Sequence, residues 1–61
     1  MLKKEFVKEY YNQINYYRFL TNMTAQHPES KVMLKARGYV FGSKKCYITA
    51  AQQQVFFEFM G

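Results

Sequence analysis

Two side chains of this sequence are of the types that act in covalent catalysis, a single cysteine and a single histidine. A thiol nucleophile needs a base within hydrogen-bond reach and an accessible, electropositive setting that lowers its pKa. Nothing in the sequence brings Cys46 and His27 together. We therefore expect Cys46 to be buried and unreactive and His27 to be a loop residue, and we predict that the protein is not an enzyme.

Metal and phosphate-loop chemistry are not supported by the residue pattern either. One Cys and one His are too few for a four-ligand zinc site, and the four acidic residues show no paired-acid arrangement. Gly38 and Gly42 bracket a short β-type segment and do not form a glycine-rich phosphate loop. We expect neither a metal nor a cofactor.

The net charge of +5 lies in one segment, because residues 31–45 contain five basic residues and no acid, while four bases and four acids cancel elsewhere. Such a cluster is suited to phosphate contacts, with Tyr39 and Tyr47 near enough to stack on bases. A solvated lysine-rich surface without a ligand is the plain alternative. The residues that we predict to bind nucleic acid are Lys31, Lys35, Arg37, Lys44 and Lys45.

The longest element that must position these residues is expected at residues 2–23. This stretch contains no Pro and no Gly, and its apolar residues recur at helical spacing, which predicts one helix of about five to six turns. At about 100° per residue, one wide arc is expected to face the core. Its members are Leu2, Phe6, Val7, Tyr10, Ile14, Tyr17 and Leu20.

A second apolar stripe lies on the opposite side of the same predicted helix. Tyr16, Phe19 and Met23 are spaced i, i+3 and i+7, and Phe57 lies off the buried side of the last predicted helix. Either other elements cover the stripe within the monomer, or it forms a dimer seam or a partner site. The second option predicts a homo-oligomer. It also gives the alternative function, a phage-type or mobile-element inhibitor or adaptor that binds a nucleic-acid-handling protein through aromatic anchors.

The middle of the chain predicts a second helix and a β-hairpin. Pro28 suits the first turn of a helix over residues 28–37, and Gly38 suits a left-handed stop. The triplets 39–41 and 46–48 are rich in β-formers and flank a polar tetrad that begins with Gly, which is typical of a hairpin. The side chains expected on its inner face are Tyr39, Phe41, Cys46 and Ile48.

The last element is a helix over residues 50–60. Thr49 and Gln52 have the spacing of a capping box, in which each side chain bonds the backbone N–H of the other. The predicted fold is therefore α+β, mainly helical, in the order α-α-β-β-α, with residues 1–61 as a single domain.

A short resemblance accompanies this last helix. The segment Ile48-Thr49-Ala50-Ala51-Gln52-Gln53-Gln54-Val55-Phe56 resembles the opening helix of the winged-helix headpiece of SOS-type repressors, a DNA-binding family. The turn and recognition helix of that family do not follow within the 61 residues, so no binding residue is carried over.

Length and composition set the remaining expectations. A domain of this size buries only about 60% of its unfolded surface, so a dense aromatic core or self-association must support it. The six Phe and six Tyr residues supply the aromatic core. No apolar run is long enough for a membrane span, and one free Cys favours a reducing, cytoplasmic location.

Overall fold

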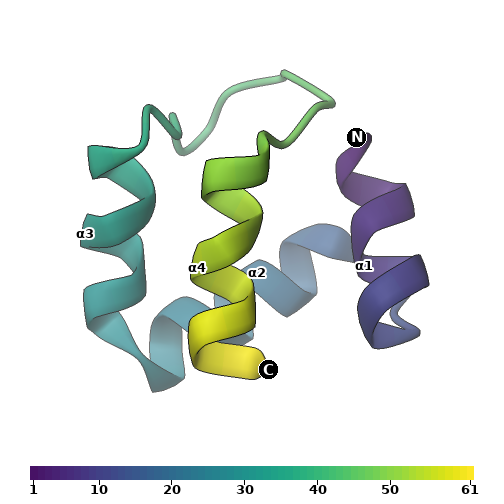
Figure 1. The fold of residues 1–61 in the computed structure, drawn as a ribbon, viewed down its shortest axis with the longest axis horizontal. Helices are drawn as coiled ribbons and strands as arrows, with labels where there is room; N and C mark the ends of the chain where they lie inside the picture. The colour runs from purple at the N-terminus through teal and green to yellow at the C-terminus, as the bar shows by residue number, and fades with distance from the viewer.

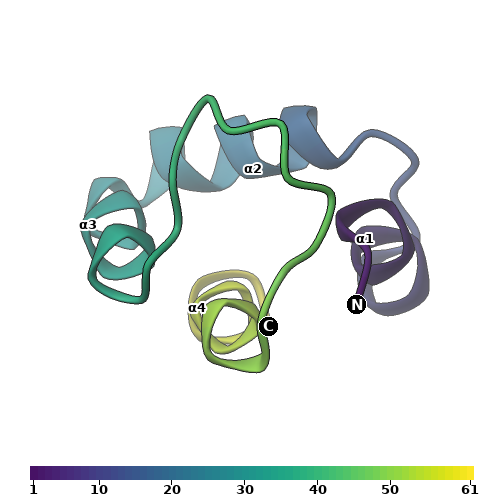
Figure 2. The same ribbon diagram turned by 90° about the horizontal axis from the view of Figure 1, so that it is seen from above.

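In the computed structural model, which describes residues 1–61, the chain folds into four helices and contains no β-strand (Figure 1). The helices are α1 (Lys3–Tyr11), α2 (Tyr16–Gln26), α3 (Pro28–Ala36) and α4 (Ala50–Met60). Helix α2 runs across the back of the other three, and α4 lies between α1 and α3 (Figure 2). The loop of residues 37–49 crosses the open end of this arrangement on its way from α3 to α4.

One aromatic core joins the helices, with Phe56 of α4 near its centre. The Phe56 ring lies 5.3 Å from the ring of Phe6 in α1 and 6.1 Å from that of Phe19 in α2, centroid to centroid. Such ring pairs add to the free energy gained by burial. The buried apolar residues are Phe6, Val7, Tyr16, Phe19, Leu20, Met23, Leu34, Tyr39, Ile48, Val55 and Phe56.

The single helix predicted over residues 2–23 is wrong, because the structure breaks it into α1 and α2 between Tyr11 and Tyr16. Asn12 adopts a left-handed conformation with φ of 54°, which ends α1. The Asn15 side chain then accepts a hydrogen bond from the Arg18 backbone N–H at 3.1 Å and caps α2. Asn tolerates the left-handed conformation and is a favoured N-cap residue, so this segment breaks without Gly or Pro.

This break changes which side chains of α2 face the core. Tyr16, Phe19 and Met23 are buried, whereas Ile14 is 88% exposed and Tyr17 is 55% exposed. The arc predicted for one continuous helix therefore fails at Ile14 and Tyr17, although Leu20, another of its members, is buried. The second apolar stripe is covered within the molecule, which is one of the two alternatives left open by the sequence.

The predicted β-hairpin is also wrong, and the fold is helical instead of α+β. The triplet 46–48 pairs with the N-terminus through one isolated antiparallel bridge between Leu2 and Tyr47. The Lys3 N–H donates to the Cys46 carbonyl at 2.7 Å, and the Ile48 N–H donates to the Met1 carbonyl at 2.8 Å. A two-stranded hairpin of such short triplets is marginal by itself, so tertiary packing selects the partner.

Several local predictions for the second half of the chain are confirmed. Helix α3 starts at Pro28, and Gly38 has φ of 78° just beyond its end. Helix α4 begins after Thr49, where both hydrogen bonds of the capping box are present. Tyr39 and Ile48 are buried as expected, but Cys46 is exposed. No helix of the structure has the length and apolar character required to cross a membrane.

Candidate functional site

Two clefts lie along the loop of residues 37–49. The first is at the N-terminal ends of α1 and α2, and the second is beside the end of α3 and the start of α4. The first has a volume of about 510 Å³ and the second about 310 Å³. Lys3 and Lys45 line both clefts. None of the four glutamates lines either one. This part of the molecule is therefore basic and partly enclosed.

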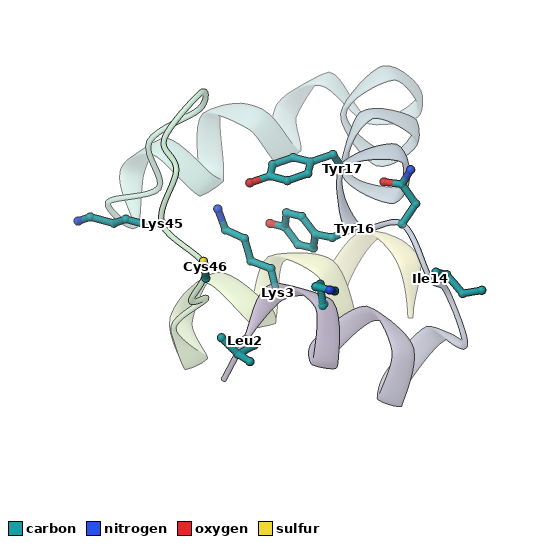
Figure 3. A pocket seen from close by; sticks show the side chains of 9 residues that line it. Leu2, Lys3, Ile14, Tyr16, Tyr17, Lys45 and Cys46 are labelled. Atoms are coloured by element: carbon teal, nitrogen blue, oxygen red, sulfur yellow. The ribbon is translucent and has the colours of Figure 1, made fainter.

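Lys3 is the most unusual residue of the site, because a lysine side chain is rarely buried without an acidic partner. It is only 6% exposed. Its Nζ lies 4.9 Å from the ring centroid of Tyr39, 5.5 Å from that of Tyr16 and 5.6 Å from that of Tyr17. Figure 3 shows the Lys3 side chain reaching toward Tyr16 and Tyr17. Cation–π attraction to these rings stabilises the ammonium group.

The tyrosines around Lys3 are themselves fixed by a hydrogen bond. The hydroxyl groups of Tyr16 and Tyr39 lie 2.9 Å apart and are both in buried side chains. Burial raises the pKa of Tyr16 well above its usual value, and the hydrogen bond with Tyr39 raises it further. The Tyr16 phenol is thus a neutral group that helps to hold the rings around the lysine.

The five basic residues predicted to bind nucleic acid lie on α3 and in the loop that follows it. Lys31 and Lys35 are exposed on α3, with their Nζ atoms 5.1 Å and 5.9 Å from the centroid of the Phe41 ring in the loop. Arg37 lines the second cleft, and its guanidinium donates to the Met33 carbonyl at 3.2 Å. Lys45 lines both clefts, while the exposed Lys44 lines neither.

The site is held by Gln52, which is buried at the start of α4. Its Nε2 donates to the Arg37 carbonyl at 3.0 Å, and its Oε1 accepts from the Thr49 N–H at 3.1 Å. One side chain therefore joins the end of α3 to the start of α4. The sequence predicted the bond to Thr49, whereas the bond to Arg37 depends on how the helices pack.

The residues predicted to form a partner surface lie in a different environment. Tyr16, Phe19 and Met23 are in the core. Phe57 is half-buried, and its ring lies 5.2 Å from that of Tyr10 and 5.6 Å from that of Phe6. These four side chains therefore serve the internal packing of the chain.

The two candidate catalytic residues are not part of one site. Cys46 lines the first cleft, while His27 joins α2 to α3 and its ring packs 5.3 Å from that of Phe59. His27 lines neither of the two clefts. No three His, Cys, Asp or Glu side chains come together in a group that could hold a metal ion.

Lys3 and Lys4 are the site residues that sequence reasoning missed. Both line the first cleft, and both come from the first turn of α1. No local pattern distinguishes a buried N-terminal lysine from a solvated one, because the three tyrosines around Lys3 come from distant parts of the chain.

Comparisons with family models, with curated proteins and with solved structures find no match to the chain. The functional conclusion therefore rests on the chemistry of the site.

Proposed function

We propose that the protein is a small, non-enzymatic regulatory protein that contacts nucleic acid through the basic residues of α3 and the following loop. The observation that carries this proposal is the segment of residues 31–45, which holds five positive charges and no acid. Basic groups on one connected surface neutralise several phosphates of a single strand or duplex. The residues are Lys31, Lys35, Arg37, Lys44 and Lys45.

The arrangement of these residues supports the proposal. Phe41 lies under the ammonium groups of Lys31 and Lys35, which brings the loop against α3. The bond from Gln52 holds the end of α3 at the second cleft. The backbone that carries the basic residues is thus ordered before binding, which lowers the conformational entropy lost when a ligand binds.

Of the two tyrosines expected to stack on bases, one is available for this role. Tyr47 is 70% exposed and lines the second cleft together with Arg37 and Lys45. Tyr39 is only 7% exposed and is hydrogen-bonded to Tyr16, so its ring belongs to the core. We propose Tyr47 as the stacking residue, because base stacking on an aromatic ring tolerates any sequence.

The test is oligonucleotide binding by fluorescence anisotropy, with single-stranded and double-stranded probes, at several salt concentrations between about 50 and 200 mM. The combined change Lys44→Glu and Lys45→Glu should weaken binding strongly. It should also lower the slope of log K against log salt by about 2 if both lysines contact phosphate. Both residues are exposed in the loop, so the fold should be retained.

The matched control is the combined change Lys8→Glu and Arg18→Glu, which alters the net charge equally on exposed positions outside residues 31–45. Binding should fall only slightly in this control, through the weaker long-range field. No binding by the unaltered protein at low salt, or an equal loss in both double variants, would contradict the proposal.

The protein-binding alternative has less support, because three of the four residues assigned to it are in the core. An inhibitor or adaptor, and a homo-oligomer, would need a different surface. A partner captured from lysate both with and without nuclease, and insensitive to added salt, would favour this alternative over nucleic-acid binding. Sedimentation as a 7.3 kDa monomer at high concentration would remove the oligomer.

A further inference from the structure

We propose that the first cleft is a binding site for a small organic anion, a compound with a flat apolar body and one phosphate or carboxylate group. This site is separate in chemistry from the extended basic surface of α3 and the loop, although Lys45 belongs to both. It therefore goes beyond the proposed contact with nucleic acid.

The size and walls of the first cleft suit such a ligand. Its volume of about 510 Å³ lies within the range of small-molecule sites, about 300–1,000 Å³. Leu2, Ile14 and Tyr17 supply apolar and aromatic wall. Ile14 and Tyr17 are largely exposed, so a ligand against them would remove apolar surface from water.

The positive charge in the cleft explains why the ligand should be an anion. Lys3, Lys4 and Lys45 all line it, and no acidic residue does. The Lys3 ammonium meets the faces of three tyrosine rings, which attract it but accept no conventional hydrogen bond. A lysine ammonium has three N–H donors, so an oxyanion in the cleft would provide acceptors that the protein does not.

The Lys3 nitrogen is not completely enclosed by the protein. Among buried side-chain N and O atoms that lack a hydrogen-bond partner, the structure contains only the Tyr11 hydroxyl. The Lys3 Nζ is not one of these buried atoms, although Lys3 as a whole is only 6% exposed. The stem of Lys3 is therefore packed, and the small exposed part of the residue includes its charged end.

The backbone holds Lys3 in place before any ligand binds. The Lys3 N–H donates to the Cys46 carbonyl, beside the bridge between Leu2 and Tyr47. The ring of Tyr39 behind the ammonium is fixed by its hydroxyl contact with Tyr16. A pre-formed site of this kind loses little conformational entropy on binding.

The test uses the whole chain and compares anionic probes with neutral analogues of the same shape. The anionic probes are 1-naphthyl phosphate, 1-naphthoate and adenosine 5′-monophosphate, and the neutral ones are 1-naphthalenemethanol and adenosine. Binding is measured by NMR titration of the backbone amides. Each anion that fits should bind at least about tenfold more tightly than its neutral analogue and should shift Leu2, Lys45 and Cys46.

The three anions distinguish the source of the ligand. Tighter binding of the adenosine monophosphate would indicate a nucleotide or the end of a nucleic-acid strand. Tighter binding of either naphthyl compound would indicate a small aromatic acid or phosphate ester. Equal affinity for a neutral compound and its anion, or no binding of any anion, would overturn the proposal.

Lys3→Met is the matching variant, because methionine keeps an unbranched apolar stem and removes the charge. We expect it to weaken binding of the anions at least about tenfold, with little effect on the neutral compounds. Lys8→Met makes the same change on exposed α1 surface outside both clefts and should leave anion binding nearly unchanged. A loss in Lys3→Met no larger than in Lys8→Met would overturn the proposal.

A second measurement needs no variant, so it holds even if Lys3→Met fails to fold. Cys46 is the only thiol, is exposed and lines the first cleft. A bound anion should slow its reaction with a neutral thiol reagent such as N-ethylmaleimide, in proportion to occupancy, whereas an unaffected rate at saturating probe would overturn the proposal. Anion binding without oligonucleotide binding would reject only the nucleic-acid function. Oligonucleotide binding without binding of the small anions would reject only this site.

Discussion

The change Gln52→Met tests whether one buried side chain holds the basic site to the helical core. Gln52 is 7% exposed and makes two hydrogen bonds through its amide, one to the Thr49 N–H and one to the Arg37 carbonyl. Methionine has a similar length and can fill the same space, but it offers neither the acceptor nor the donor. The change therefore removes hydrogen bonds with little loss of packing.

The expected loss is about 2 kcal/mol in the free energy of unfolding. Each hydrogen bond contributes about 1 kcal/mol net, and both are removed. Thr49 and Arg37 are exposed, so water can reach the Thr49 N–H and the Arg37 carbonyl when Gln52 no longer bonds them. The larger penalty of a buried unpaired group is therefore not expected. For a domain of this length, about 1 kcal/mol corresponds to about 4–8 °C in Tm, so Tm should fall by about 8–16 °C.

The assay is a thermal melt followed by circular dichroism, with Gln54→Met as the control. Gln54 lies on the exposed side of the same helix, so this substitution should change Tm by only a few degrees. Thr49→Ala should cost about 1 kcal/mol, because it removes the Thr49 side chain from the capping box. The double variant should lose less than the sum, since both residues form one box.

A Gln52→Met melt that matches the control would refute this reasoning. The bond to Arg37 would then contribute nothing to stability, and the end of α3 would be positioned by apolar packing alone. A loss no larger than that of Thr49→Ala would show that the capping box matters and that the bond to Arg37 does not.

Two further predictions concern α2 and the segment that precedes it. Met23→Ala should cost about 2–5 kcal/mol because Met23 is fully buried, whereas Ile14→Ala should change stability by about 0.5 kcal/mol or less because Ile14 is 88% exposed. Urea unfolding measures both losses. If α1 and α2 formed one continuous helix, the larger loss would be that of Ile14→Ala. Burial raises the pKa of Tyr16, so above about pH 10 the unfolded chain loses a proton that the folded chain keeps. Stability should therefore be full below that pH and fall as the pH rises through it, and urea unfolding at several pH values should show a smaller fall for Tyr16→Phe.

Local interactions allowed the sequence alone to predict the second half of the helical structure. Pro28 at the start of α3, Gly38 after its end and Thr49 before α4 act within a few residues of themselves. Each works through its own backbone angles or through a hydrogen bond to a near neighbour, so its effect does not depend on the rest of the fold. The concentration of basic residues in 31–45 is likewise a property of the sequence alone.

Only the tertiary structure decided the faces of α2, the pairing of residues 46–48 and the environment of Lys3. The apolar periodicity of the sequence continues through Asn12 and Asn15, but in the structure Phe6 of α1 and Phe19 of α2 both pack against Phe56 of α4, from two short helices with different buried faces. Residues 46–48 pair with the N-terminus because the fold brings it alongside them. Lys3 is buried by tyrosines from α2 and the loop, and no residue near it in the sequence predicts these contacts, because burial depends on segments that meet only in the folded chain.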